Sequence, residues 1–182
     1  MDRRDFLTKA GLVSLASAPL LVGLPQRAEA GDENGATAFF FTGLSKSTVN
    51  PTGEQTTVAG AGRFSAADGE VEGGGCYNFV NTGAPKPNPL LEFGNWRAKR
   101  LVSWKPFGRY GSQGAGILVL GVTLFPVGGA PYDAMLKVVC NVPFVPLVTG
   151  EDEGFTLTTP TVTFVPAGTG ITLFCFSFSS DD

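Results

Sequence analysis

The fold is decided by the stretch Ile117-Leu118-Val119-Leu120-Gly121-Val122-Thr123-Leu124-Phe125. Leucine or valine occupies every second position from Leu118 to Leu124, and the positions between them include Gly121 and Thr123. Side chains of a strand point alternately to its two faces, so one face of this segment is apolar throughout. The stretch therefore predicts a β-strand that buries one face.

Similar apolar runs recur along the chain, separated by Gly, Pro, Asn and Thr. With the stretch above they make eight expected strands, the others being Thr37–Leu44, Gln55–Ser65, Glu70–Val80, Asn95–Phe107, Ala134–Val142, Phe155–Val165 and Ile171–Phe178. Asp68-Gly69 suits a tight turn, and we expect Pro166–Gly170 to close the last hairpin. Short strands at fairly even spacing predict an all-β domain of about eight antiparallel strands, forming a small barrel or a sandwich.

The first thirty residues have the order of regions found in a signal peptide. The charged start, residues 1–9, is followed by a weakly apolar run from Ala10 to Leu24 and by the small-x-small pattern Ala28-Glu29-Ala30. The apolar run has about fifteen residues, whereas a helix needs roughly twenty to cross a bilayer. We therefore expect a helical signal peptide over residues 1–30, cleavage after Ala30 and no stable membrane anchor.

Four residues of this segment carry a family resemblance. Arg3, Arg4, Phe6 and Leu7 resemble the motif of twin-arginine translocation signals, although Lys9 stands one place later than the usual lysine. The resemblance implies that the chain is a partner of the twin-arginine export machinery and is exported to the periplasm or the extracellular medium. It also implies that residues 31–182 fold before export, and we expect them to form one domain.

Charge and composition exclude several classes of function. Four of the 13 basic and three of the 16 acidic residues lie in residues 1–30, which leaves nine basic and 13 acidic residues and a net charge of −4. A domain with so few cations is not expected to bind nucleic acid. The chain has no histidine, which removes the usual general base and the commonest zinc ligand. We expect no metal and no cofactor.

The three cysteines leave two alternatives open. Cys76, Cys140 and Cys175 are too widely spaced for a compact metal or redox motif. An oxidising destination permits one disulfide in any of three pairings. Cysteine is also a common buried residue, so all three could be free thiols in the core.

The most distinctive segment is Trp96-Arg97-Ala98-Lys99-Arg100-Leu101-Val102-Ser103-Trp104-Lys105. Strict alternation places Trp96, Ala98, Arg100, Val102 and Trp104 on one face, which the two tryptophans mark as the inner face. A buried guanidinium needs a carboxylate partner, for which Glu92 and Asp133 are the candidates. The segment predicts a ligand-binding site formed by Trp96, Arg100 and Trp104, for a small, partly apolar ligand. The alternative is an internal ion pair, or an arginine that reaches the barrel end.

Two groups of carboxylates are weaker candidates. Glu70 and Glu72 would lie on one strand face about 7 Å apart, a separation used by inverting glycosidases. Glu151-Asp152-Glu153 could bind a hard cation. Solvated acidic turns and strand faces are the commoner reason for both patterns.

No catalytic motif is present, and residues 31–182 carry no motif that identifies a family. We expect no catalytic residue and a non-catalytic exported protein that binds a small ligand or has a structural or interaction role. The alternative is a histidine-independent enzyme: a carboxylate glycosidase, or a cyclase or isomerase working in a barrel cavity.

Overall fold

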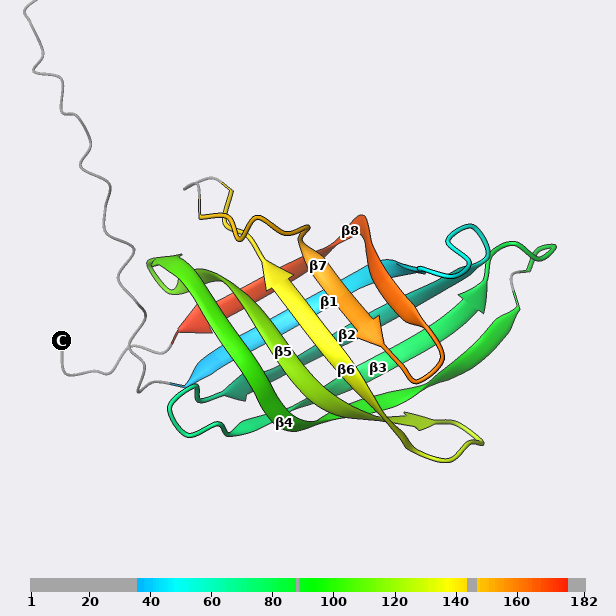
Figure 1. Ribbon diagram of the computed structural model, residues 1–182, viewed down its shortest axis with the longest axis horizontal. Coiled ribbons are helices and arrows are strands. Elements are labelled where there is room, and N and C mark those ends of the chain that lie inside the picture. The colour runs from blue at the N-terminus through cyan, green and yellow to red at the C-terminus, as the bar shows by residue number, and fades with distance from the viewer. Residues whose placement is uncertain (1–35, 88, 144–146, 177–182) are drawn as a thin grey trace, which may run out of the picture.

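The eight strands of the computed structural model follow one another in chain order around a closed antiparallel barrel (Figure 1). They are β1 (Thr37–Ser47), β2 (Glu54–Phe64), β3 (Val71–Asn81), β4 (Leu90–Tyr110), β5 (Gln113–Pro126), β6 (Tyr132–Cys140), β7 (Gly154–Thr158) and β8 (Thr163–Phe176). The structure describes residues 36–87, 89–143 and 147–176, so the predicted signal peptide lies outside the described residues. The all-β prediction is confirmed, and of its two architectures the barrel is the one observed.

The first and last strands close the ring. β1 pairs with β8 along almost its whole length, from Thr37↔Phe176 to Ser47↔Phe164. β5 also touches the end of β8, through the pair Gly114↔Phe174. In Figure 1, β5, β6 and β7 cross in front of β1, β2 and β3, so the barrel is flattened into two layers. Within the described residues, no helix has the length and apolar character needed to cross a membrane.

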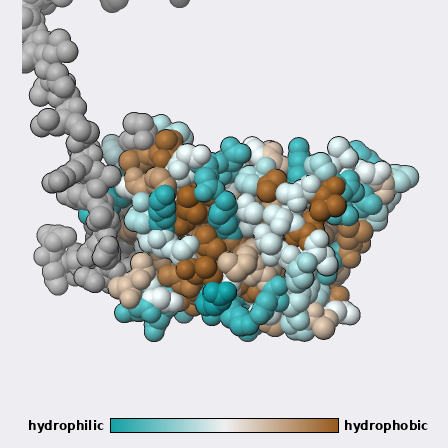
Figure 2. Space-filling model, in the orientation of Figure 1, coloured by the Kyte–Doolittle hydropathy of each residue, from teal (hydrophilic) through white to brown (hydrophobic). Residues whose placement is uncertain are grey.

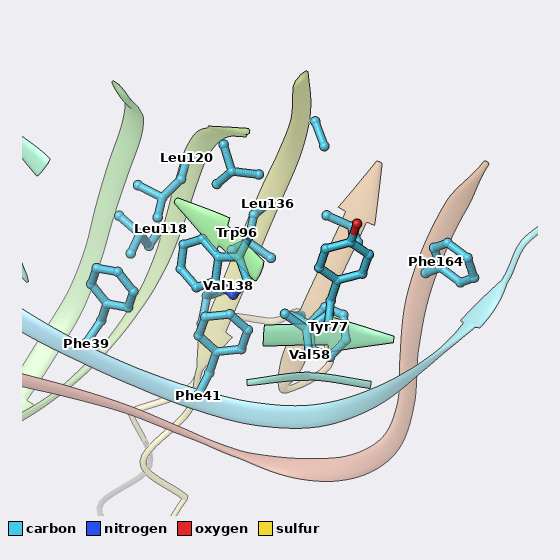
Figure 3. Packing of buried hydrophobic residues seen from close by; sticks show 14 of the residues in the cluster. Phe39, Phe41, Val58, Tyr77, Trp96, Leu118, Leu120, Leu136, Val138 and Phe164 are labelled. Atoms are coloured by element: carbon cyan, nitrogen blue, oxygen red, sulfur yellow. The ribbon is translucent and has the colours of Figure 1, made fainter. Parts of the chain in front are cut away.

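The interior between the layers is filled with aromatic and branched side chains. The inner face of β5 is the predicted one, and its four alternating residues are at most 1% exposed: Leu118, Leu120, Val122 and Leu124. They meet Phe39 and Phe41 of β1 and Trp96 of β4 across the core (Figure 3). Alternation therefore predicted the buried face correctly wherever the ladder is regular.

The predicted boundary between the last two strands is wrong. The expected strand Phe155–Val165 is divided by a turn after β7, and β8 already begins at Thr163. Thr159 makes this turn, because its hydroxyl donates to the Val162 carbonyl at 3.0 Å and accepts from the Val162 N–H at 3.1 Å. Pro160 follows Thr159 inside this turn, and a proline is disfavoured in the interior of a strand, so it was a signal for the break that the expected strand Phe155–Val165 passed over.

The segment Pro166–Gly170 is not the predicted hairpin either. It lies within β8, where the register against β1 shifts between Leu44 and Ser45, whose partners are Thr169 and Pro166. The two extra residues form a bulge, and Gly168 has a φ of +77° that suits glycine. A glycine- and proline-rich segment here marks a bulge in a continuous strand.

β4 departs from strict alternation in its middle. Its register against β5 shifts between Ala98 and Arg100 and again between Leu101 and Ser103. Each bulge inserts one residue, so from Ala98 onward the inward side chains lie three positions apart in the chain, at Ala98, Leu101 and Trp104. Trp96, Ala98, Leu101 and Trp104 all face the core, as do their partners on β5. The prediction that Arg100 and Val102 face inward is wrong, since both are exposed on the outer face.

Candidate functional site

The predicted ligand-binding residues occupy three separate environments. Trp96 is 1% exposed, its ring lies 5.8 Å from that of Phe41, and its Nε1 donates to the Ala59 carbonyl at 3.1 Å. Trp104 packs between Phe64, at 4.9 Å, and Phe174, at 4.8 Å. The structure therefore places both indoles in the interior, each with its own aromatic neighbours.

Arg100 is not with them. Its side chain lies on the outer face over Gly121, where its Cγ and Nε are 3.0 Å from the position that a Cβ would take. Neither predicted carboxylate forms an ion pair with its guanidinium. Glu92 binds two tyrosines, and Asp133 forms an ion pair with Lys99 at 2.6 Å, although the charge of Arg100 adds a minor contribution to the lowered pKa of Asp133. Trp96, Arg100 and Trp104 therefore do not line one common pocket.

Glycines make room for the two indoles. A Cβ on Gly60 would lie 2.1 Å from Trp96 Cζ2, and a Cβ on Gly116 would lie 2.2 Å from Trp104 Cη2. The two indole rings thus fill the space that the side chain of any residue other than glycine would occupy at positions 60 and 116. A ligand could reach this part of the interior only by displacing them.

A polar cluster interrupts the apolar interior on β3, β4 and β6. The Glu92 carboxylate accepts hydrogen bonds from the Tyr77 hydroxyl at 2.9 Å and from the Tyr132 hydroxyl at 2.6 Å. Burial, and then the neighbouring carboxylate, raises the pKa of both phenols far above the ordinary value. The cluster satisfies a partly buried charge, and sequence reasoning missed it because its members lie far apart in the chain.

A cleft of about 650 Å³ opens between the β2–β3 hairpin and the bulged part of β4. Its apolar lining residues are Ala36, Phe64 and Val71, of which Phe64 is only 2% exposed. The charged residues around it are Arg63, Asp68, Glu70, Glu72, Lys99 and Arg100. The cleft therefore brings together Arg100 and the predicted carboxylate pair, which lie on opposite walls. Its volume is in the range of ordinary ligand sites.

The cleft exists because β3 and β4 separate. They pair from Val80↔Leu90 to Gly74↔Arg97 and no further. Beyond that point no described strand pairs with Val71–Gly73 on this side, or with the edge of β4 that starts at Ala98. Four of the six partly buried core side chains belong to these two segments: Val71, Ala98, Leu101 and Trp104. The core is thus least covered where the sheet is open.

Basic residues concentrate on the same strand. β4 holds five of the nine basic residues of residues 31–182, and the chain has no acidic residue between Glu92 and Asp133. Among the described residues, no carboxylate lies within 4.0 Å of the charged nitrogens of Arg97, Arg100 or Lys105. Figure 2 shows hydrophilic side chains over the bend of β4 beside apolar side chains over β5. A net acidic domain therefore presents a local basic stripe.

The other carboxylates are engaged separately. Glu72 forms an ion pair with Arg63 at 2.5 Å on the wall of the cleft. In the acidic loop, Glu151 pairs with Lys137 at 2.5 Å, whereas Glu153 accepts a hydrogen bond from the Thr172 hydroxyl at 2.8 Å. These two carboxylates have different partners, and no group of three potential metal ligands occurs within the described parts of the chain.

The three cysteines are free thiols: Cys76 is exposed, Cys175 is half-buried and Cys140 is buried. Of the two alternatives the structure shows the unpaired one, although only Cys140 belongs to the core. Burial raises the pKa of the Cys140 thiol.

Comparison with family models, with curated proteins and with solved structures gave no match. The function must therefore be argued from the cleft, the open edge and the basic stripe.

Proposed function

We propose that this chain is an exported, non-catalytic binding protein whose ligand lies in the cleft between the β2–β3 hairpin and β4. The export part of the proposal depends on the resemblance of Arg3, Arg4, Phe6 and Leu7 to a twin-arginine signal. The binding part depends on the barrel. Its destination is the periplasm or the extracellular medium, and it works without a cofactor.

The observation that carries the proposal is the position of Arg100. This guanidinium has no carboxylate within 4.0 Å among the described residues, and it lines a cleft whose apolar residues include Phe64 and Val71. Charged residues outnumber apolar ones in this lining, so charge is expected to contribute more to ligand selection here than in a typical, mostly apolar site. The predicted ligand, small and partly apolar, fits this composition when it also carries an anionic group. The packing of Trp96 and Trp104 favours the cleft over the barrel interior.

Thermal denaturation in the presence of small carboxylates with aromatic or alkyl groups tests the proposal. A ligand that binds only the folded state raises the melting temperature, by an amount that grows with the logarithm of its concentration above Kd. We expect at least one such compound to raise it, and Arg100→Ala to abolish the shift. Lys46→Ala is the matched control, since Lys46 is an exposed cation on β1 that does not line the cleft. An equal loss of the shift in both variants would contradict the assignment.

A histidine-independent enzyme is the second candidate, because Glu70 and Glu72 line the same cleft. Glycosidases use two carboxylates, one of them as the acid. Glu72 already forms an ion pair with Arg63 at 2.5 Å, so its carboxylate is engaged by a side chain of the protein. A screen with chromogenic glycosides decides between the two: turnover that disappears in Glu72→Gln would establish the enzyme and reject the non-catalytic proposal.

Export is tested independently. Replacing Arg3 and Arg4 by lysine in a bacterial host with a twin-arginine system is expected to retain the protein in the cytoplasm. Cell fractionation and the mass of the exported protein report the route and the cleavage after Ala30. Unchanged export of the double variant would exclude the twin-arginine route.

A further inference from the structure

We propose that the open edge of β4, residues Ala98–Lys105, binds an extended peptide segment of a partner protein whose acidic and apolar side chains alternate. The inference rests on the proposed function, in that it names the partner for the same cleft. Peptides commonly bind exposed sheet edges by adding a strand, with backbone hydrogen bonds for affinity and side-chain contacts for specificity.

The backbone supplies the first argument. One edge of β4 pairs with β5, whereas no described strand covers the other edge beyond Arg97. Across the cleft, Val71–Gly73 of β3 also lack a described partner on this side. Unpaired N–H and C=O groups on two facing strands form a template for a further strand.

The inner side chains supply the second. Ala98, Leu101 and Trp104 face the core from this edge and remain partly exposed. Cross-strand neighbours lie about 5 Å apart, so the inward side chains of an added strand would contact these three residues. Apolar side chains at alternate positions of the peptide would therefore bury the exposed parts of Ala98, Leu101 and Trp104.

The outer side chains determine the charge of the partner. Lys99, Arg100 and Lys105 are exposed on the other face of the same segment. Opposite charges stabilise cross-strand pairs, and like charges destabilise them. On the facing strand, Glu72 is paired with Arg63, whereas Arg100 and Lys105 have no carboxylate within 4.0 Å among the described residues. The cations of β4 therefore determine the expected charge, and the outward positions of the peptide are expected to be Glu or Asp. The same rule disfavours a second copy of this chain at the edge, because β4 paired with β4 would bring basic residues together.

Length follows from the register. Six residues of β5, Ile117–Val122, are sufficient to oppose the eight residues Ala98–Lys105 because of the two bulges. A peptide of seven residues is thus long enough to cover the edge. Other ligand classes, such as a sulfated polysaccharide, could use the basic stripe but not the backbone edge.

The experiment measures fluorescence anisotropy of labelled Glu-Val-Glu-Val-Glu-Val-Glu, blocked at both ends, with the full chain. Three comparison probes are a Lys-Val peptide, the same acidic peptide N-methylated at its valines, and heparin. The charge-reversal variant is Arg100→Glu with Lys105→Glu, and Lys46→Glu is the matched control on β1. Melting temperatures of all variants show that they are folded. Amide shifts in ¹⁵N NMR spectra locate the binding surface.

We expect the acidic peptide to bind, the Lys-Val peptide not to bind, and N-methylation to abolish binding. The double variant should weaken binding by about tenfold or more, whereas Lys46→Glu should not. Amide shifts should fall on Ala98–Lys105 and Val71–Gly73.

Binding that survives N-methylation, heparin binding with the same variant dependence but no peptide binding, or slow exchange of the edge amides in the free protein would overturn the inference. The proposed function survives such a result if a small ligand still depends on Arg100. If neither kind of probe depends on Arg100, both proposals are wrong.

Discussion

The bulges of β4 lead to a sharp prediction about two adjacent residues. Strict alternation buries Val102, whereas the observed register buries Leu101 opposite Leu120, and Val102 is 40% exposed. Leu101→Ala should therefore destabilise the barrel, and Val102→Ala should not. The two substitutions remove similar side chains from one strand, so they differ mainly in the direction in which each side chain points.

The expected magnitudes follow from burial. Truncation of a buried leucine to alanine costs about 2–5 kcal/mol, and the partial exposure of Leu101 places it near the lower end, about 2 kcal/mol. Val102 already contacts water, so its loss is expected to cost about 0.5 kcal/mol. For a domain of this size each kcal/mol lowers the melting temperature by about 3 °C, which predicts shifts of about 6 °C and about 1–2 °C.

Urea and thermal denaturation followed by tryptophan fluorescence measure both changes, because Trp96 and Trp104 flank the mutated positions in β4. Equal slopes of the urea transitions would show that both variants unfold in the same manner. A larger loss in Val102→Ala than in Leu101→Ala would refute the bulged register, and with it the outward position of Arg100.

Stability is expected to decrease as the pH rises above 10, the ordinary pKa of tyrosine, because Tyr77 and Tyr132 keep their protons to higher pH in the folded state than in the unfolded chain. The stabilisation is complete below that pH; urea transitions at pH 9 and 11 measure its loss, and Tyr77→Phe should reduce the difference. Iodoacetamide at pH 8 should modify exposed Cys76 readily and buried Cys140 only after unfolding, and peptide mass spectrometry would contradict this if both reacted equally. Gly75→Ala should cost about 3 kcal/mol or more, since its Cβ would lie 1.9 Å from a backbone oxygen of β2; a loss below about 1 kcal/mol in urea would show that the strands can separate there.

The regular part of the fold could be predicted from sequence for a simple reason. In β5 and β6 the ladder runs without a register shift, so period-two patterning maps directly onto burial. Leu136 and Val138 were expected inside and are at most 1% exposed. Where a strand has no bulge, alternation in the sequence predicts which side chains are buried.

The irregular parts could not be predicted in this way. A bulge changes the face of every later side chain, but its signal in β4 is only the pairs Lys99-Arg100 and Val102-Ser103, which alternation reads as ordinary strand residues. The turn after β7 is built by Thr159, a residue that is more typical of strands. In β4 the local sequence is compatible with a regular strand, and the partner strand determines the outcome. After β7 the neighbouring Pro160 does mark a break, but period-two patterning alone does not register it.

The candidate site shows the same division. Arg100 was selected because alternation placed it between two tryptophans on the inner face, and that alternation is broken by a bulge. The cleft around it also uses Arg63 from a different hairpin. That no described strand pairs with β4 beyond Arg97 is a property of topology, because no residue type marks where a neighbouring strand ends. Sequence could therefore suggest a functional residue here, but not the surface to which it belongs.

An open sheet edge that avoids pairing with its own copy and an open edge that binds a partner have similar features. Bulges and cations on an edge strand prevent pairing between identical copies, and β4 has both. To prevent pairing between copies, charges of either sign on the edge strand are sufficient, and so is an edge whose inner side chains are fully buried. Here the uncovered inner side chains, Leu101 and Trp104, keep apolar surface at the edge, and the charges are all of one sign. This combination repels a copy of the chain and attracts an acidic strand, so a specific partner explains both features together, whereas protection explains only the charges.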